Sequence, residues 1–587
     1  MQFMNNALVI ADIPAKAQVA IEYRVPLTAK RVDFILTGQD VDDRDTAVIV
    51  ELKQWSDVEM TDKDAVVRTW IGGAVRDQAH PSYQAWTYAA LINDYNSSVQ
   101  DGDIQLAPCA FLHNCNDGNA VNDSRYQEHI ERAPTFIKND TQELAEFLKR
   151  HIRSEDRNDI LYRIDNGRLR PSKSLADELV SLMGGNREFQ LIDDQKIVYE
   201  NALALSAESH RSGKRRVLIV NGGPGTGKTV VAINLLVELT RRERVAQYVS
   251  RNAAPRAVYA AKLAGTMKKN RIGNLFRGSG AYIDATPRGI DALIVDEAHR
   301  LNEKSGLYGN LGENQIRELV QASSFSVFFV DDNQRVTLKD IGSANSIREQ
   351  AELCGAEILE MNLASQFRCN GSDGYLSWVD NALQIRETAN TDLDGIDFDF
   401  RVCSTPNELR DLVVASNIVN GKSRMVAGYC WNWKGKKDSS IEDVRIPEHD
   451  FSAKWNLDKD GGLWIMQPDS ITEIGCIHTC QGLELDTVGV IVGPDLIVRD
   501  GKVVTDATKR SSQDRSIHGY KGWAKKDPEA ARVAADEVIK NTYRTLMTRG
   551  MRGCFFYSTD SETNEYFRDM VVAQKSEALS LAAEPDV

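Results

Sequence analysis

A glycine-rich turn between an apolar strand and an apolar helix is the feature that most constrains this fold. The turn, GGPGTGKT at Gly222–Thr229, matches the pattern G-x-x-x-x-G-K-[ST]. The residues RRVLIV before it predict a buried strand, and VVAINLLVEL after it predicts a helix. Backbone N–H groups of such a turn point at phosphate oxygens, and the helix dipole adds to the attraction. We therefore expect an α/β ATP-binding domain in which Lys228 binds the β- and γ-phosphates and Thr229 binds Mg²⁺. The glycines expected to cradle the phosphates are Gly222, Gly225 and Gly227.

Two further apolar strands end in polar residues that would complete an ATP site. DALIVDEAHRL carries Asp296 and Glu297 at its end, and ligands of open α/β sheets bind at the carboxyl ends of strands. Asp296 is predicted to hold Mg²⁺, and Glu297 to orient and deprotonate the attacking water. SVFFVDDNQRV carries Gln334, an amide placed to sense the γ-phosphate. Upstream, Gln195 is a candidate reader of the adenine edge, with a solvent-facing helix residue as the alternative.

The remaining motifs indicate the kind of ATPase. They are LASQFRCNGSDGYLSWVD with Arg368, QGLE at residues 481–484, and NTYRTLMTRGMRGC, a predicted helix with Arg544 and Arg549. In this order they resemble the motif series of superfamily 1 helicases. The residues within these motifs resemble those of the Schlafen group 3-type DNA/RNA helicase domain, and the resemblance covers roughly residues 188–560. The resemblance implies two recA-like lobes with ATP in the cleft between them.

The resemblance also implies roles for single residues. Arg368 and Arg549 become the arginines that neutralise γ-phosphate charge from the second lobe, and Glu484 becomes a contact to the ribose. Asp331 stands where the family usually has glycine, which is expected to change little because Gln334 is retained. The segment QYVSRNAAPRAV takes the place that touches the nucleic-acid strand. Its candidate contacts are Ser250, Asn252 and Arg256.

The front third of the chain carries a second acidic pattern. IEYRVPLTAKRVDFILTG leads through strand-like segments to Asp33, and TAVIVELKQWSD carries Glu51 and Lys53. Strand alternation places Glu51 and Lys53 on one sheet face, with Leu52 packing behind. This arrangement resembles that of PD-(D/E)xK nucleases, in which the two carboxylates bind Mg²⁺ and the lysine positions the attacking water or stabilises the phosphorane charge. The alternative is an inactive nuclease fold retained for DNA binding.

Two neighbouring features fit the same nuclease pattern. Glu22, in the strand-like run before Asp33, is a further candidate metal ligand. Gln84 and Tyr88 are four residues apart on an amphipathic helix and therefore share a face. A Q-x-x-x-Y pattern after E-x-K resembles the RecB-like branch of these nucleases. The iron–sulfur cysteines of some relatives are missing, so no cluster is implied.

The composition of the chain constrains the charge of the protein surface and the cellular compartment in which we expect the protein. The net charge of −14 opposes a protein that coats nucleic acid with its whole surface, although it allows a locally basic channel. The segment GYCWNWKGKKD suits base stacking and phosphate binding, and core tryptophans beside an exposed lysine turn fit it equally well. Its aromatic and cationic residues are Trp431, Trp433, Lys434, Lys436 and Lys437. The absence of a bilayer-length apolar stretch or a signal peptide, and nine scattered cysteines, predict a cytoplasmic protein with no membrane partner.

The expected architecture is a PD-(D/E)xK nuclease fold followed by two recA-like P-loop lobes. The predicted parts are a nuclease-like domain (1–150), a connector (151–187), a first lobe (188–360), a second lobe (361–572) and a flexible tail (573–587). We expect a nuclease–helicase that uses ATP and Mg²⁺ to translocate on and cleave nucleic acid, with single-stranded DNA as the expected partner and bacterial defence against phage as the expected role. The alternatives are a nucleic-acid-sensing ATPase switch without unwinding and an RNA- or tRNA-directed nuclease. The sequence leaves open whether the chain forms a homo-oligomer.

Overall fold

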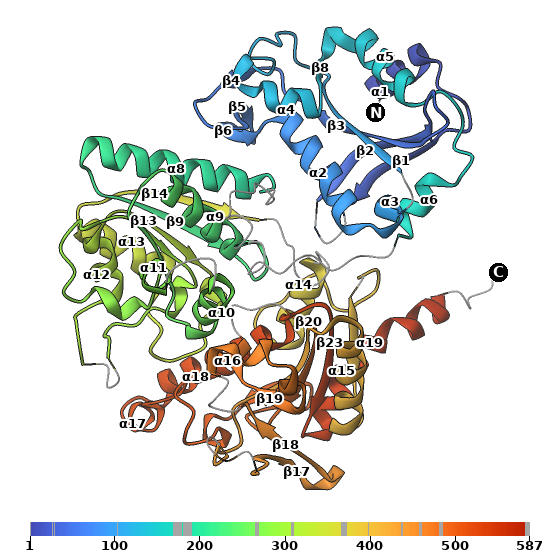
Figure 1. Ribbon diagram of the computed structural model, residues 1–587. Coiled ribbons are helices and arrows are strands. Elements are labelled where there is room, and N and C mark those ends of the chain that lie inside the picture. The colour runs from blue at the N-terminus through green and yellow to red at the C-terminus, as the bar shows by residue number, and fades with distance from the viewer. Residues whose placement is uncertain are drawn as a thin grey trace. The chain divides into compact units, whose positions relative to one another are not determined.

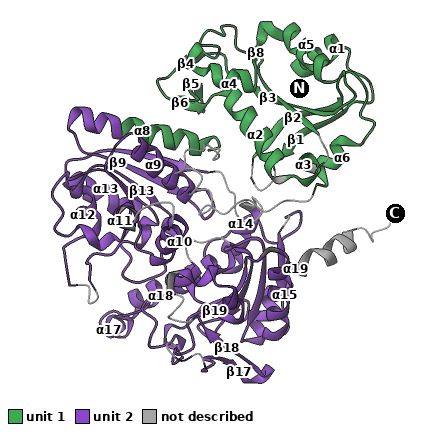
Figure 2. Cartoon of the chain, viewed as in Figure 1, with its two compact units in different colours: residues 1–173, 187–205 green, residues 174–186, 206–587 purple. Residues whose placement is uncertain are grey.

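The computed structural model of the chain divides into two compact units (Figure 2). Unit 1 comprises Met1–Lys173 and Arg187–Leu205, and unit 2 comprises Ser174–Asn186 and Ser206–Val587. The structure describes residues 2–581 apart from 26–27, 29, 102–103, 168–178, 180–190, 265–268, 307–309, 365–372, 397, 436–437, 439, 457–460 and 481–484.

Unit 1 is built on a five-stranded mixed sheet in the order β1-β2-β3-β7-β8 (Figure 1). The first three strands are antiparallel neighbours, whereas β3, β7 and β8 run parallel. A small antiparallel sheet, β4-β5-β6, is inserted after β3. The strands are β1 (Gln18–Arg24), β2 (Arg31–Gln39), β3 (Asp45–Lys53), β4 (Val58–Met60), β5 (Val66–Ile71), β6 (Ala74–Ala79), β7 (Gln105–Leu112) and β8 (Thr135–Ile137). The helices are α1 (Gln2–Ala11), α2 (Pro81–Tyr95), α3 (Ser97–Asp101), α4 (Gln127–Arg132), α5 (Thr141–His151) and α6 (Ile160–Asp165).

The two faces of this sheet have different partners. Apolar side chains such as Phe34 of β2 and Val50 of β3 form a buried cluster with α1 and α5. Leu52 packs against the same cluster, as the sequence predicts. Because strand side chains alternate, Asp33 and Glu51 point to the opposite face, on which α2 contacts β3 and β7.

Unit 2 holds two sheets that are parallel except for one edge pair. The first has the order β11-β10-β12-β13-β9-β14, and the second has the order β15-β23-β20-β16-β19-β18-β17, in which only β17 and β18 are antiparallel. The strands of the first are β9 (Arg216–Gly222), β10 (Ala246–Val249), β11 (Phe276–Arg277), β12 (Ile290–Val295), β13 (Ser323–Val330) and β14 (Glu357–Leu363). Those of the second are β15 (Asp399–Val402), β16 (Ser423–Ala427), β17 (Val444–Ile446), β18 (Phe451–Trp455), β19 (Glu473–Gly475), β20 (Leu485–Val492) and β23 (Gly550–Ser558). A separate hairpin pairs β21 (Leu496–Arg499) with β22 (Lys502–Thr505).

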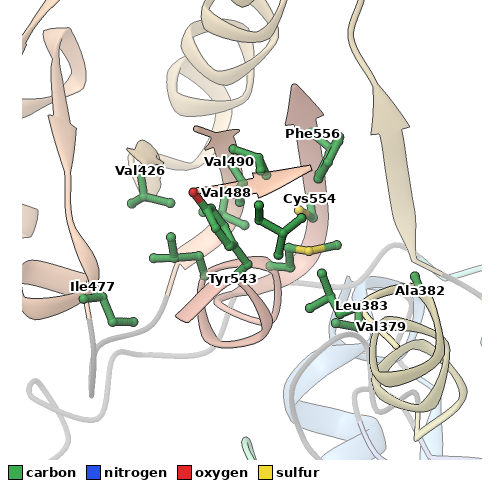
Figure 3. Packing of buried hydrophobic residues seen from close by; sticks show 14 of the residues in the cluster. Val379, Ala382, Leu383, Val426, Ile477, Val488, Val490, Tyr543, Cys554 and Phe556 are labelled. Carbon is green, nitrogen blue, oxygen red and sulfur yellow. The ribbon is translucent and has the colours of Figure 1, made fainter. Parts of the chain in front are cut away.

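Helices connect and cover the strands of both sheets. Strands β9, β12, β13 and β20 read as nearly continuous apolar runs, as expected for parallel strands buried on both faces. Figure 3 shows the core of the second sheet, where Val488 and Val490 pack near Tyr543 and Phe556. The helices are α9 (Lys228–Arg241), α10 (Ala253–Leu263), α11 (Lys269–Leu275), α12 (Gln315–Ala322), α13 (Ala344–Leu353), α14 (Asp373–Ala382), α15 (Pro406–Asn420), α16 (Ile477–Cys480), α17 (Tyr520–Ala524), α18 (Pro528–Met547) and α19 (Ser561–Leu581). The predicted α/β class with parallel sheets is confirmed.

One helix is shared between the two units. Helix α8 (Asp194–Ser212) is grouped with unit 1 up to Leu205 and with unit 2 from Ser206 onward, as the two colours of Figure 2 show. The domain boundary at residue 188 stays a prediction.

Candidate functional site

The phosphate-binding turn joins β9 to α9. Gly225 and Gly227 have φ values of 78° and 81°, a left-handed conformation that favours glycine. A Cβ on Gly222 would lie 2.6 Å from a threonine hydroxyl of the turn. Lys228 is 7% exposed, and its Nζ donates to the carbonyls of Gly222 and Gly223, both at 2.6 Å. The turn therefore has the cramped, glycine-dependent backbone that phosphate binding requires.

Asp296 follows β12 and links three neighbours through its carboxylate. Its Oδ2 accepts from the Thr229 hydroxyl at 2.8 Å and from the Tyr248 hydroxyl at 2.7 Å. Its Oδ1 accepts from the N–H of Glu297 at 2.9 Å. Burial and then the Glu297 charge raise the pKa of Asp296, although its hydrogen bonds and Lys228 oppose the rise. Hydroxyl and carboxylate oxygens are ligands that Mg²⁺ takes together with substrate phosphates, so this pair fits that cation.

Glu297 begins a chain of contacts that runs to the end of the next strand. Its Oε2 lies 2.8 Å from His299 Nε2, and His299 Nδ1 accepts the N–H of Asp331 at 3.3 Å. Because Nδ1 accepts, the imidazole proton lies on Nε2 and faces the glutamate. Asp331 Oδ2 in turn accepts from Gln334 Nε2 at 2.8 Å. Burial acts to raise the pKa of Glu297, but His299, helped by Arg549, holds it well below its usual range.

Asp331 has contacts that a glycine could not make. Its Oδ1 accepts from the N–H of Asn333 at 3.1 Å, which caps the short turn that carries Gln334. Its Oδ2 holds the Gln334 amide, which is buried. The Asp331 side chain therefore holds the amide of Gln334, the predicted γ-phosphate sensor, and the expectation that the departure changes little stays a prediction.

The predicted arginines differ in their surroundings. Arg549 is 1% exposed and lies between α18 and β23, not on the helix, and its charge lowers the pKa of Glu297. Arg544 lies on α18 and forms a buried ion pair with Asp380 of α14, with Nη2 3.3 Å from Oδ2. Arg544 is therefore a packing residue. Arg368 and Glu484 lie outside the described residues.

The three candidate nucleic-acid contacts of the first sheet are engaged locally. Ser250 is buried, and its N–H donates to a carbonyl of β11 at 3.2 Å. The Asn252 side chain caps α10 by accepting the N–H of Ala254 at 3.2 Å. Arg256 Nε donates to the Asn252 carbonyl at 3.2 Å, and burial lowers the pKa of its guanidinium. Their contact with nucleic acid stays a prediction.

The tryptophan-rich segment favours the core alternative. Trp431 Nε1 donates to the Arg445 carbonyl at 3.2 Å, and Trp431 meets Trp455 edge-on at 6.3 Å between ring centroids. Trp433 packs against the same apolar cluster. The backbone N–H of Lys434 donates to an aspartate. Lys436 and Lys437 lie outside the described residues.

A second group of polar side chains lies on the α2 face of the unit 1 sheet. The β2–β3 register, with Phe34 opposite Val50, puts Asp33 opposite Glu51. Asp33 Oδ2 accepts the N–H of Leu52 at 2.7 Å. Lys53 Nζ lies 2.7 Å from Glu51 Oε1.

Glu51 is buried, and its Oε2 has no hydrogen-bond partner within the described part of the chain. Burial raises the pKa of Glu51 to about 7; Lys53 opposes this rise and Asp33 adds to it. Burial likewise raises the pKa of Asp33. Such a site favours a cation that would neutralise both carboxylates, which suits Mg²⁺.

Helix α2 brings the predicted glutamine and tyrosine to the same face. Gln84 Nε2 donates to the Tyr88 hydroxyl at 2.9 Å. The Tyr88 hydroxyl donates to Asp193 Oδ2 at 2.7 Å, and Lys30 Nζ lies 3.0 Å from the same oxygen. The charge of Glu51 acts on both Tyr88 and Lys30, so these groups surround one site.

Glu22 is less suited to a metal than the sequence suggests. The residue has a backbone φ of 56°, and its side chain is 56% exposed, with Oε2 3.9 Å from Arg31 Nη1. Among the described residues, no three His, Cys, Asp or Glu side chains are grouped so that they could hold a metal ion. Any cation here therefore rests on Asp33 and Glu51.

Gln195 lies in the part of α8 grouped with unit 1. It is buried, and its Oε1 accepts the N–H of Ile192 at 3.2 Å. The solvent-facing alternative is wrong, and adenine recognition stays a prediction. Within the described residues, no helix is long and apolar enough to cross a membrane.

Four residues of these sites were not identified from the sequence. His299 follows Asp296 by three positions in the printed DEAH, a spacing that could have identified it. Tyr248 reaches Asp296 only because β10 neighbours β12. Lys30 and Asp193 are far apart in the chain and carry no local signal.

Comparison with known proteins supports the ATPase assignment. Residues 215–560 match the model of the family described as "Schlafen group 3, DNA/RNA helicase domain". The uncharacterized protein YPL245W of Saccharomyces cerevisiae is 23% identical over 384 residues, which cover 60% of this chain and 83% of that protein.

Two solved helicase structures match with low overall similarity. S. cerevisiae Dbp5 bound to RNA and ADP BeF3 has a TM-score of 0.27 and 13% identity, covering 68% of this chain and 90% of that chain. The DUF1998 helicase MrfA bound to DNA and AMPPNP has a TM-score of 0.28 and 10% identity, covering 70% of this chain and 54% of that chain.

Proposed function

Because the chain belongs to the Schlafen group 3 DNA/RNA helicase domain family, we propose that it is an ATP-driven motor on single-stranded DNA whose unit 1 cleaves the strand. The family makes unit 2 a helicase-like nucleic-acid ATPase. Translocation, unwinding and cleavage are the proposal. The observation that carries the motor is the contact chain from Glu297 through His299 and Asp331 to Gln334.

This chain joins the group that would activate water to the group that would sense the γ-phosphate. The pKa of Glu297 is held well below its usual range, and its Oε2 lies 2.8 Å from His299 Nε2, so Glu297 is held as an ionised base. Loss of the γ-phosphate would act on Gln334 and Asp331, and through His299 on Glu297. Lys228 and Arg549 would neutralise phosphate charge, as in related phosphoryl-transfer sites. Mg²⁺ bound by Thr229 and Asp296 would neutralise further charge on the phosphates.

The cleavage activity is supported by the arrangement on the α2 face of unit 1. Asp33 and Glu51 lie opposite each other and would hold Mg²⁺, which would polarise the scissile phosphate. Lys53 is on the same face and would stabilise the charge that develops on that phosphate. Glu51 Oε2, which has no hydrogen-bond partner among the residues that the structure describes, supports a cation at this place.

Paired measurements on the full chain test both activities. Glu297→Gln and Lys228→Ala should reduce DNA-stimulated phosphate release by at least about 10³-fold, because each removes a group that acts on the transferring phosphoryl. Asp33→Asn and Glu51→Gln should abolish Mg²⁺-dependent cleavage of labelled single-stranded DNA and leave phosphate release within about twofold, since unit 2 is untouched.

Four results would contradict the proposal or one of its parts. Normal ATP turnover in Glu297→Gln would rule out the motor site. Cleavage that survives in Glu51→Gln would leave unit 1 as a binding platform. ATP hydrolysis without separation of a fluorescent duplex would favour a nucleic-acid-sensing switch, and stronger cleavage of RNA than of DNA would favour the RNA-directed alternative.

A further inference from the structure

The segment that leads into α8 carries one carboxylate into the polar site of unit 1. Asp193 immediately precedes the helix, has a φ of 38° and is 7% exposed. Its Oδ2 accepts from the Tyr88 hydroxyl at 2.7 Å and from Lys30 Nζ at 3.0 Å. Its Oδ1 is buried without a hydrogen-bond partner in the described part of the chain. A buried oxygen of this kind calls for an explanation, and a bound water, ion or ligand is one.

The contact between Asp193 and Tyr88 fixes the direction of a hydrogen-bond chain. An ionised carboxylate only accepts, so Tyr88 must give its proton to Asp193. The Tyr88 oxygen can then accept, and it does so from Gln84 Nε2 at 2.9 Å. The amide nitrogen of Gln84 is thereby occupied, which leaves its oxygen as the end that can accept from a water or approach a cation. Asp193 thus sets the orientation of Gln84 through Tyr88.

Asp193 also places a second cation beside the acidic pair. Lys30 is held by Asp193, and the Glu51 charge acts on it. Lys53 lies against Glu51 from β3. The site therefore has one ammonium bound to the candidate metal ligand and another bound to Asp193, an arrangement suited to a phosphate that carries negative charge on several oxygens.

The same helix is anchored in both units. In unit 1, Lys196 Nζ lies 2.7 Å from Asp64 Oδ2, and the Tyr83 hydroxyl donates to the Leu191 carbonyl at 2.6 Å. In unit 2, the Ser209 hydroxyl donates to the Ser324 carbonyl of β13 at 2.7 Å. Asp193 therefore lies directly before a helix whose last residues, from Ser206 onward, are grouped with unit 2.

Resting on the proposed nuclease function, we propose that Asp193, in the segment directly before α8, is a positioning residue of the cleavage site. It orients Gln84 through Tyr88 and holds Lys30 for a phosphate of the bound strand. This residue lies outside both the D…E-x-K and the Q-x-x-x-Y patterns.

The test uses the full chain, labelled single-stranded DNA and Mg²⁺. Asp193→Asn should lower kcat for cleavage about 10–100-fold, the usual cost of removing a partner that orients a site, and leave ATP hydrolysis unchanged. Tyr88→Phe removes the same chain without altering shape, and the double variant should be no slower than the slower single variant. Asp193→Glu should recover part of the rate. Lys30→Gln should chiefly raise KM.

Asp64→Asn is the matched control, because it removes the ion pair between Asp64 and Lys196 of α8. Lys196 retains its second partner, Glu200, at 2.8 Å. The cleavage rate of Asp64→Asn should stay within about twofold of the wild type. Equal losses in Asp64→Asn and Asp193→Asn, or additive losses in the double variant, would show a merely structural anchor and overturn the inference. If the wild type cleaves and Asp193→Asn cleaves within about twofold of its rate, the inference is also overturned. The proposed nuclease function would be unaffected by that result. A wild type that cleaves neither DNA nor RNA would overturn both.

Discussion

A single phenolic hydroxyl supports the predicted magnesium carboxylate. Tyr248 lies fully buried on β10, and its hydroxyl donates to the same Asp296 oxygen that accepts from Thr229. Two donors on one oxygen hold the carboxylate in a single orientation. The neighbouring aromatic rings of Tyr259 and Phe276 fix the Tyr248 ring in turn.

Tyr248→Phe should raise the Mg²⁺ concentration needed for half-maximal ATP hydrolysis about 10-fold, because removal of a partner of a ligating carboxylate typically costs that much in metal affinity. The measurement is phosphate release against Mg²⁺ at saturating ATP. Tyr282→Phe is the control, since that buried tyrosine donates to Gln247 and not to Asp296. The same Mg²⁺ dependence in both variants would contradict the role of Tyr248.

Glu51 makes the stability of unit 1 depend on pH. Its folded-state pKa is about 7, above the 4.5 of a free glutamate, so the unfolded chain ionises first as the pH rises. Stability should therefore fall between about pH 4.5 and 7, by at most about 3 kcal/mol at about 1.36 kcal/mol per pKa unit. Glu51→Gln should lack this loss and be more stable than the wild type at pH 8, but not at pH 4.

Urea unfolding in EDTA at pH 4 and pH 8 checks the expectation. Mg²⁺ at pH 8 should restore stability to the wild type alone, because the glutamine cannot replace a carboxylate ligand. Parallel pH profiles for the two proteins would show that Glu51 is not the group responsible.

At the scale of elements, the connection from β13 to α13 is pressed against the turn that carries Glu297. A Cβ on Gly342 would lie 1.8 Å from the Ala298 carbonyl oxygen and 3.0 Å from the His299 Cα. The N–H of Ile341 donates to the Leu301 carbonyl at 2.8 Å. The backbone segments that follow β12 and β13 are therefore in direct contact.

Gly342→Ala should therefore displace the His299 turn and reduce ATP hydrolysis at least about 10-fold, while the strand cleavage proposed for unit 1 should be unaffected. The cause is steric, since backbone atoms cannot make room as a flexible side chain would. Gly273→Ala is the control, because nothing lies within 4 Å of a Cβ at that helical position. Wild-type turnover in Gly342→Ala would show that the turn can shift without harm.

Helices, strands and turns that depend on consecutive residues were predictable from the sequence. Which strands lie side by side in a sheet was not. The turn at Gly222–Thr229 and the strand before Asp296 can both be recognised from consecutive residues. The partnership of Asp33 with Glu51 needed only strand alternation and an antiparallel neighbour. Tyr248 required the knowledge that β10 lies beside β12, which depends on the crossover order of the sheet and leaves no trace in nearby residues.

At the scale of the whole molecule, the α/β class and the parallel sheets followed from apolar runs and polar strand ends. The predicted domain boundaries stay a prediction, and the structure groups Arg187–Leu205 with unit 1. The cause is a set of polar contacts between residues far apart in the chain, such as Lys196 with Asp64 and Tyr88 with Asp193. No periodicity reveals such pairings.

The shared helix α8 limits how this protein could be dismantled or recombined. A graft of unit 1 onto another ATPase, cut in the connector that the sequence predicts at residues 151–187, would leave behind Asp193 and Lys196. Asp64 would lose a buried cation, and Lys30 and Tyr88 would lose their common acceptor. A transferable module has to include the helix as far as Asn201, whose side chain accepts from Lys63. The boundary between the two units therefore lies within helix α8, between Leu205 and Ser206.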